Sequence, residues 1–267
     1  MRKLFFIIFI FIILLVLTIS GILFDSKLIV SISAIASAFL GSVISILFES
    51  IDTNGQGLRL WWQHLKYYNQ EIRLSFSYLF KIEINGKYLL IRGKRLRKQF
   101  QPIGGVYKYY KEAKPILEKF KYKTDIKMGN TNDTDDLRIS LKGKYILKFT
   151  KWFLSMKDRE YDPYREFQEE LINSGLISKE DFKILKYRKI DTHNKGITKS
   201  TFNKCNEFIY ADIFELDLTE KQKQILLTAV ENNPDILCLA SDVELSSECY
   251  NGIEKNLGNN AKWLIGE

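Results

Sequence analysis

Cysteine is scarce in this chain of 267 residues, and the three that occur (Cys205, Cys238 and Cys249) form no Cys-x-x-Cys pair. Their number and spacing exclude a disulfide-stapled secreted module and are typical of reduced thiols. Residues 49–267 hold 37 basic and 31 acidic residues, a modest excess, and contain no motif of a DNA-reading helix. We therefore expect no DNA partner.

Charge is absent from two further stretches, Leu4–Phe24 and Leu28–Phe48. Each run of 21 residues, as a helix, is about 30 Å long, which is the thickness of a bilayer's hydrocarbon core. The pattern predicts a two-helix transmembrane hairpin over residues 1–48. The alternative for the first run is a signal peptide, whose apolar region is usually shorter. Arg2 and Lys3 favour a cytoplasmic N-terminus, and two spans then place the C-terminus on the same side.

The second run carries small residues at four-residue spacing, namely Ser33, Ser37, Gly41 and Ser45. Such a stripe packs either on the first run or on other copies of the chain, and the second case predicts a homo-oligomer. Residues 49–73 follow as a polar hinge and an aromatic-rich segment. This segment is interpreted as an interfacial helix or, equally, as the first helix of the next domain.

Strand patterns begin at Leu74, where apolar and polar residues alternate up to Ile84. Asn85-Gly86 comes next and is a strong hairpin signal. A basic run follows, with Arg92, Lys94, Arg95 and Arg97, and lies close to Gly104 and Gly105 in the sequence. These residues are either a charged surface edge or a phosphate-binding site for a nucleotide ligand.

A capped helix is predicted from Asp162 to Gly175. Glu166, Glu169 and Glu170 have helical spacing that places three carboxylates on one face. Such a face is either solvated or compensated by cationic side chains or by a hard divalent ion such as Mg²⁺.

The string Arg165-Glu166-Phe167-Gln168-Glu169-Glu170, together with the Gly104-Gly105 turn and the strand pattern, resembles the Nudix family. The resemblance covers roughly residues 74–267 and implies a mixed β-sheet domain with flanking helices. It implies that Glu166, Glu169 and Glu170 bind Mg²⁺, that Glu169 and Glu170 are catalytic if the domain is an enzyme, and that Arg165 has a structural salt-bridge role. The chain departs from the family pattern in several respects: Lys111 and Ile172 occupy positions where the family has a glutamate and a glycine, and Gly105 and Arg165 are 60 residues apart. We therefore expect an insertion at about 108–158, including a hairpin of 137–139 with 144–153.

With the predicted hairpin, the chain is interpreted as a membrane-anchored α+β protein. This architecture resembles the two-transmembrane Nudix effectors of bacterial CBASS antiphage systems. The resemblance implies a multi-pass protein of the bacterial inner membrane, with both termini cytoplasmic. Its Nudix-like domain would sense a cyclic nucleotide, and its helices would disrupt the lipid bilayer, which causes cell death or growth arrest. The alternative is a membrane-tethered, Mg²⁺-dependent Nudix hydrolase of a nucleoside diphosphate derivative.

Overall fold

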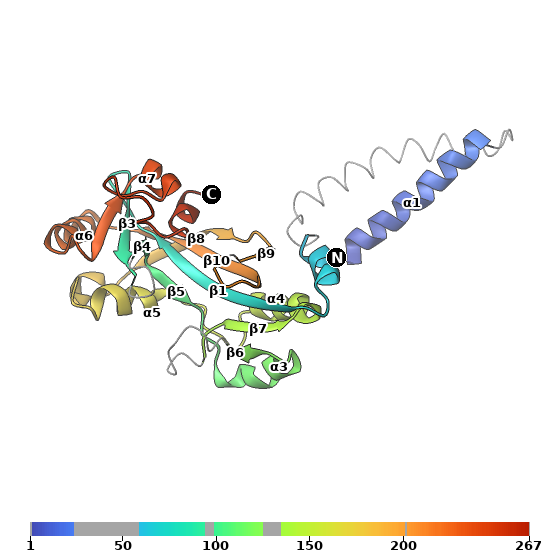
Figure 1. The fold of residues 1–267 in the computed structure, drawn as a ribbon, viewed down its shortest axis with the longest axis horizontal. Coiled ribbons are helices and arrows are strands. Elements are labelled where there is room, and N and C mark those ends of the chain that lie inside the picture. The colour runs from blue at the N-terminus through green and yellow to red at the C-terminus, as the bar shows by residue number, and fades with distance from the viewer. Residues whose placement is uncertain (1, 24–58, 94–98, 125–134, 201, 267) are drawn as a thin grey trace. The chain divides into compact units, whose positions relative to one another are not determined.

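The computed structural model describes residues 2–23, 59–93, 99–124, 135–200 and 202–266. The chain divides into two compact units, Met1–Trp62 and Gln63–Glu267, and each is described here by itself. The second unit is an α+β domain built on a mixed sheet (Figure 1).

The first unit contains helix α1 (Arg2–Leu23). The second apolar run, 28–48, and the small-residue stripe within it lie outside the described residues. A membrane span needs about 20 consecutive apolar residues folded as one helix. Within the described ranges, no helix combines the length and the apolar character that crossing a bilayer requires. The predicted transmembrane hairpin and the multi-pass inner-membrane location were therefore wrong.

Within the described residues, the main sheet has seven strands. Its central path runs in the order β6 (Lys123–Thr124), β7 (Arg138–Lys142), β1 (Glu71–Lys81), β10 (Asn206–Asp217) and β8 (Lys186–His193). Strand β5 (Gly104–Val106) pairs with β1, and β9 (Ile197–Lys199) pairs with β10. Because β1 runs parallel to β10 and antiparallel to β7 and β5, the sheet is mixed.

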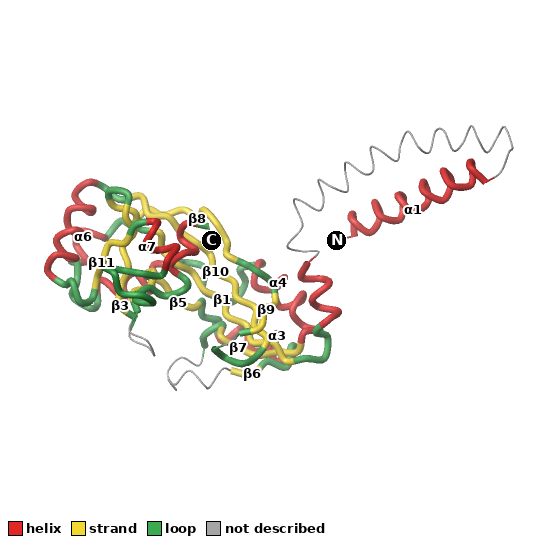
Figure 2. The backbone as a smooth tube through the Cα atoms, turned by 45° about the horizontal axis from the view of Figure 1, so that its top comes forward, coloured by secondary structure: helices red, strands yellow, loops and turns green. Residues whose placement is uncertain are grey.

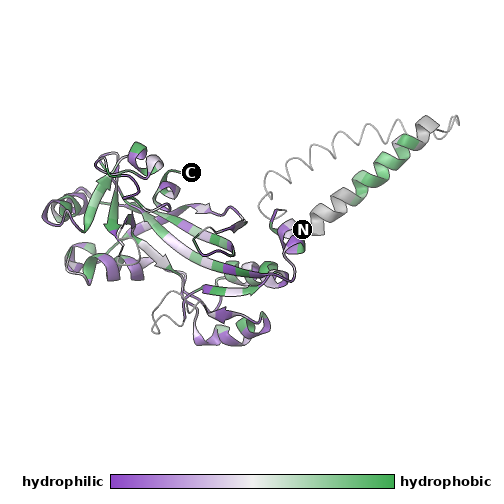
Figure 3. Ribbon diagram, in the orientation of Figure 1, coloured by the Kyte–Doolittle hydropathy of each residue, from purple (hydrophilic) through white to green (hydrophobic). Residues whose placement is uncertain are grey.

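A smaller sheet holds β11 (Leu237–Ala240), β3 (Lys87–Arg92), β2 (Glu83–Ile84) and β4 (Phe100–Pro102). The predicted turn at Asn85-Gly86 joins β2 to β3, and both residues have positive φ, 52° and 72°. The long first strand predicted up to Ile84 is interrupted after Lys81, so β1 belongs to the main sheet and β2 to the smaller one. Figure 3 shows the mostly apolar character of β3 and β11.

The flanking helices are α3 (Lys114–Lys119), α4 (Ile146–Leu154), α5 (Tyr164–Phe167), α6 (Glu220–Asn232) and α7 (Asp242–Ser247), with a 3₁₀ turn η6 (Ala261–Ile265) near the C-terminus (Figure 2). Short 3₁₀ turns also occur at Lys111–Ala113, Gly143–Tyr145 and Lys179–Phe182. Helix α6 begins with a reciprocal capping box between Thr219 and Gln222.

The insertion contains β6, β7, α3 and α4 rather than the predicted hairpin of 137–139 with 144–153. Only the first of its two predicted strands forms, as β7. The second segment is helical because Ile146, Phe149 and Phe153 recur at three- and four-residue spacing and are fully buried. Phe149 and Phe153 pack against Phe76 of β1 with ring centroids 5.1 and 4.4 Å apart, which anchors the insertion to the main sheet.

Candidate functional site

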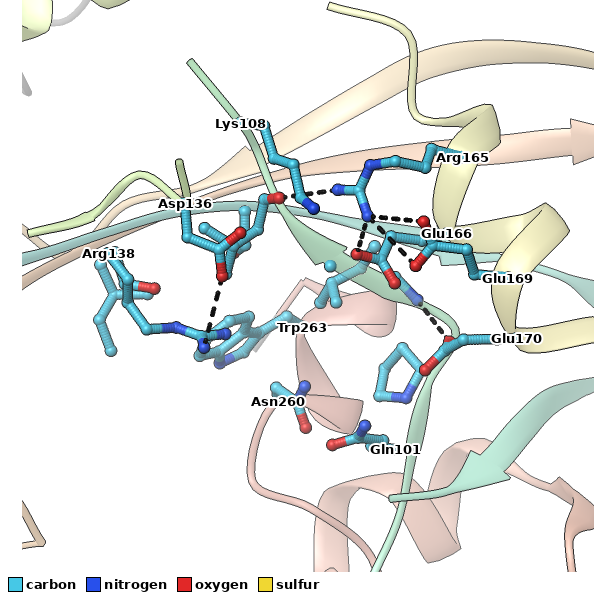
Figure 4. Close-up of a pocket in the computed structure, with 18 of the residues that line it drawn as sticks. Gln101, Lys108, Asp136, Arg138, Arg165, Glu166, Glu169, Glu170, Asn260 and Trp263 are labelled. Carbon is cyan, nitrogen blue, oxygen red and sulfur yellow. Dashed lines mark hydrogen bonds and ion pairs between the residues drawn. The ribbon is translucent and has the colours of Figure 1, made fainter. Parts of the chain in front are cut away.

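A cavity of about 460 Å³ lies over one face of β1 and is lined by residues from several separate stretches of the domain (Figure 4). Side chains alternate along a strand, and β1 therefore presents Arg73, Ser75, Ser77 and Leu79 to the cavity. The alternate residues Ile72, Leu74, Phe76 and Tyr78 are completely buried. The small serines leave room above the strand, which is one reason that a hollow forms there.

The Gly104-Gly105 strand lies against the predicted glutamates. A Cβ on Gly105 would meet Glu166 Oε1 at 2.0 Å, and a Cβ on Gly104 would meet the Tyr78 carbonyl oxygen at 2.2 Å. The backbone N–H of Gly104 donates to Glu170 Oε2 at 3.2 Å. Glycine is therefore required at both positions, because the strand approaches a side chain on one side and a backbone on the other.

Arg165 lies at the centre of a cluster of three carboxylates, those of Glu160, Glu166 and Glu169. Its Nε donates to Glu160 Oε1 at 2.7 Å and its Nη2 to Glu160 Oε2 at 3.2 Å, which makes a bidentate pair. Its Nη1 lies 2.7 Å from Glu166 Oε1 and 3.4 Å from Glu169 Oε1. Nη2 also donates to the Val106 carbonyl oxygen at 3.1 Å, so the arginine ties the helix of the motif to the end of β5.

These contacts affect the pKa values of Arg165 and Glu166. Burial by itself lowers the pKa of Arg165, but its hydrogen bonds to Glu160 and the nearby charges of Glu166 and Glu160 raise that pKa above its ordinary value overall. Burial raises the pKa of Glu166, against the opposing effect of Arg165. The guanidinium therefore remains charged and is the cation that compensates this group of carboxylates.

The predicted magnesium site is not assembled in this arrangement. Among the residues that the structure describes, no group of three or more His, Cys, Asp or Glu side chains is placed to hold a metal ion. The helix of the motif is α-helical only over α5 and continues as a π-helical turn η4 (Gln168–Ile172), in which Asn173 N bonds to Gln168 O, five residues back. Glu170 is held by Gly104, whereas Glu166 and Glu169 pair with Arg165, so the three carboxylates do not converge. The residues as placed here therefore do not fit the divalent metal ion that the resemblance implies.

The remaining walls bring in side chains that the sequence motifs did not indicate. Arg73 pairs with Glu207 at 3.4 Å, Arg138 lies 3.9 Å from Asp136, and Lys108 enters from the segment after β5. Gln101, Asn260 and Trp263 complete the lining. The alternation along β1 could have indicated Arg73, but no local signal indicates the others, because they come from segments distant in sequence.

The predicted phosphate-binding residues have mixed positions. Gly104 and Gly105 line the cavity, whereas Lys94, Arg95 and Arg97 lie outside the described residues. Arg92 does not line this cavity: its Nε donates to the Asp235 carbonyl oxygen and its guanidinium lies 4.2 Å from the Phe100 ring centroid.

Comparison with known proteins gives one match. Residues 71–265 match the model of a family described as SMODS-associated NUDIX domain. Searches of curated proteins and of solved structures gave no match.

Proposed function

Because the chain belongs to the SMODS-associated NUDIX domain family, which supports a Nudix effector of the CBASS type, we propose that its cavity binds a cyclic nucleotide. The cavity volume, about 460 Å³, falls in the range of small-molecule sites. Four cationic side chains line it (Arg73, Lys108, Arg138 and Arg165). Cationic side chains favour a ligand that carries phosphates.

The observation that carries this proposal is the state of Lys108. Its ammonium makes no hydrogen bond or ion pair within the described part of the chain, and it extends toward the cavity beside Arg165 (Figure 4). The nearby carboxylates Glu160, Glu166 and Glu169 already pair with Arg165. Lys108 is thus a cation available to a phosphate group of the ligand.

The same arrangement favours binding over hydrolysis. Metal-assisted attack on a phosphate requires carboxylates that can hold the ion. Here the guanidinium of Arg165 lies among them, and the third glutamate accepts a backbone hydrogen bond. In our proposal the domain is the sensing part of the effector, and ligand binding shifts the population of its conformations by the ligand's differential affinity for them.

Isothermal titration of the full chain with cyclic di- and trinucleotides tests the proposal. The variant Lys108→Met should weaken binding roughly 10-fold or more, since it removes a charge-assisted contact, and Lys108→Arg should retain most of the affinity. Lys111→Met, a change at an exposed lysine three residues later, is the matched control and should bind like the original chain. Absence of binding by every nucleotide in the series would refute the proposal.

The competing candidate is a Mg²⁺-dependent hydrolase, which is favoured by the presence of Glu166, Glu169 and Glu170 in the same cavity. Phosphate release from nucleoside diphosphate derivatives, measured with and without Mg²⁺, separates the two. A hydrolase should lose turnover in Glu169→Gln and Glu170→Gln. A sensor should show no Mg²⁺-dependent release in the first place.

A further inference from the structure

One side of the cavity has a different chemistry from the side that carries Lys108 and Arg165. Trp263 and Asn260 belong to the turn around η6, and Gln101 lies on β4. In Figure 4, Asn260 and Gln101 lie next to each other, on the side of the cavity away from Lys108 and Arg165. Both also lie within 4 Å of the position that a Cβ of Gly258 would occupy.

Trp263 is held in a fixed orientation. The His193 ring stacks on its indole, with centroids 4.0 Å apart and planes at 12°. Its neighbours Ala261 and Leu264 are buried and fix the η6 turn to the core of the small sheet. Trp263 itself is only partly buried and lines the cavity. A preformed aromatic surface of this kind costs little entropy when a flat ligand stacks on it.

The two carboxamides beside it have unused hydrogen-bonding capacity. Neither the Asn260 nor the Gln101 side chain makes a hydrogen bond within the described part of the chain. Gln101 alternates with the buried Phe100 and Pro102 on β4, so its side chain points away from the core. A carboxamide offers a donor and an acceptor side by side, which matches the paired donors and acceptors on the edge of a nucleobase.

We infer that Trp263, Asn260 and Gln101 form a nucleobase subsite, in which one base of the ligand contacts the indole and the carboxamides bond its edge. This inference rests on the proposed function and adds to it the position of the base relative to the phosphates. The ligand spans the cavity, with its phosphates beside Lys108 and one base beside Trp263. Base recognition at this subsite selects among nucleotides that share the same phosphates.

The test compares two probes on the full chain: cyclic di-adenylate, which carries bases, and inorganic pyrophosphate, which carries none. Stacking of a base on an aromatic side chain typically contributes enough for Trp263→Ala to weaken cyclic di-adenylate binding about 10- to 100-fold. Trp263→Phe should retain much of the affinity, and Asn260→Ala should weaken it without disturbing the indole. All three variants should bind pyrophosphate like the original chain, whereas Lys108→Met should lose both probes.

Tryptophan fluorescence gives a second readout. Cyclic di-adenylate should quench the emission of the original chain, and this quenching should disappear in Trp263→Phe although the other three tryptophans remain. Unchanged affinity of Trp263→Ala for cyclic di-adenylate overturns the subsite and leaves the proposed function standing. An equal loss of both probes in that variant also overturns it, because the residue then acts only through the fold. If neither probe binds the original chain, the proposed function fails, and the subsite fails with it.

Discussion

Replacing Arg165 by methionine removes the cation from three carboxylates while keeping a side chain of similar length. Glu160, Glu166 and the arginine are partly buried, with side-chain exposures of 10%, 17% and 24%. Breaking a fully buried ion pair costs about 3–5 kcal/mol, and the partial exposure here reduces our expectation to about 2–4 kcal/mol. Urea unfolding of the full chain at neutral pH measures this loss.

The loss should depend on pH in a defined direction. Without the guanidinium, burial and repulsion from Glu169 and Glu160 raise the folded-state pKa of Glu166 further above the unfolded value of about 4.3. The folded variant then binds more protons than the unfolded one, so its stability rises as the pH falls through that raised pKa. The difference in the free energy of unfolding between Arg165→Met and the original chain should therefore become smaller under mildly acidic conditions.

The matched control is Arg188→Met, which removes an ion pair with Glu215 from an arginine whose side chain is 77% exposed. Exposed pairs contribute roughly 0–1 kcal/mol, so this variant should be nearly as stable as the original chain. Added Mg²⁺ should stabilise Arg165→Met more than the original chain, because the carboxylates then lack their cation. A deficit no larger than that of Arg188→Met, or one that does not change with pH, would contradict the role of Arg165 as the compensating charge.

Three further predictions concern the surroundings of the site. Gly105→Ala should lower the free energy of unfolding by about 1–3 kcal/mol through overlap with Glu166, and the same change in a Glu166→Ala background should cost much less in chemical denaturation. Burial, followed by the Lys195 charge, lowers the pKa of His193 to about 4. As the pH falls from about 6.5 to 4, the unfolded chain therefore binds the proton at this histidine before the folded chain does. The free energy of unfolding should fall across that window by on the order of 1–2 kcal/mol, a value reduced for the partial exposure of the ring. His193→Gln should remove this part of the pH dependence of Tm. Asp212 accepts hydrogen bonds from two hydroxyls in the core and pairs with a lysine, so Asp212→Asn should cost about 2–4 kcal/mol in urea unfolding, whereas Asp217→Asn at an exposed site should cost almost nothing.

Local features of the chain were predictable because their causes are local. The Asn85-Gly86 turn depends on two adjacent residues that tolerate positive φ. The start of α5 depends on Asp162, whose carboxylate accepts from the Tyr164 amide at 2.9 Å. The helical segment continues through η4 to Ile172 and stops shortly before Gly175, which has a φ of 78°. The string from Arg165 to Glu170 placed these residues beside one another on one helical segment.

The predictions that failed depended on more than local sequence. Counting uncharged residues over 1–48 predicted two membrane spans, but no described helix meets the requirements for crossing a bilayer. The predicted strand over 144–153 is instead largely helical, because its buried positions follow the period of a helix. Helical spacing could not indicate the partners of the three carboxylates, which are Arg165 for Glu166 and Glu169 and the Gly104 amide for Glu170.

The Asn85-Gly86 turn, the residues that bound the motif helix and the acidic motif itself could be predicted from the sequence, because each needs only neighbours within a few positions along the chain. Which residues meet in the cavity depends on the tertiary structure. It brought Glu170 to Gly104 across 66 residues and placed Trp263 and Lys108 over the same strand. The physical reason is that strand pairing and core packing join segments by shape and hydrogen bonding, and no local pattern records which distant segment supplies the partner.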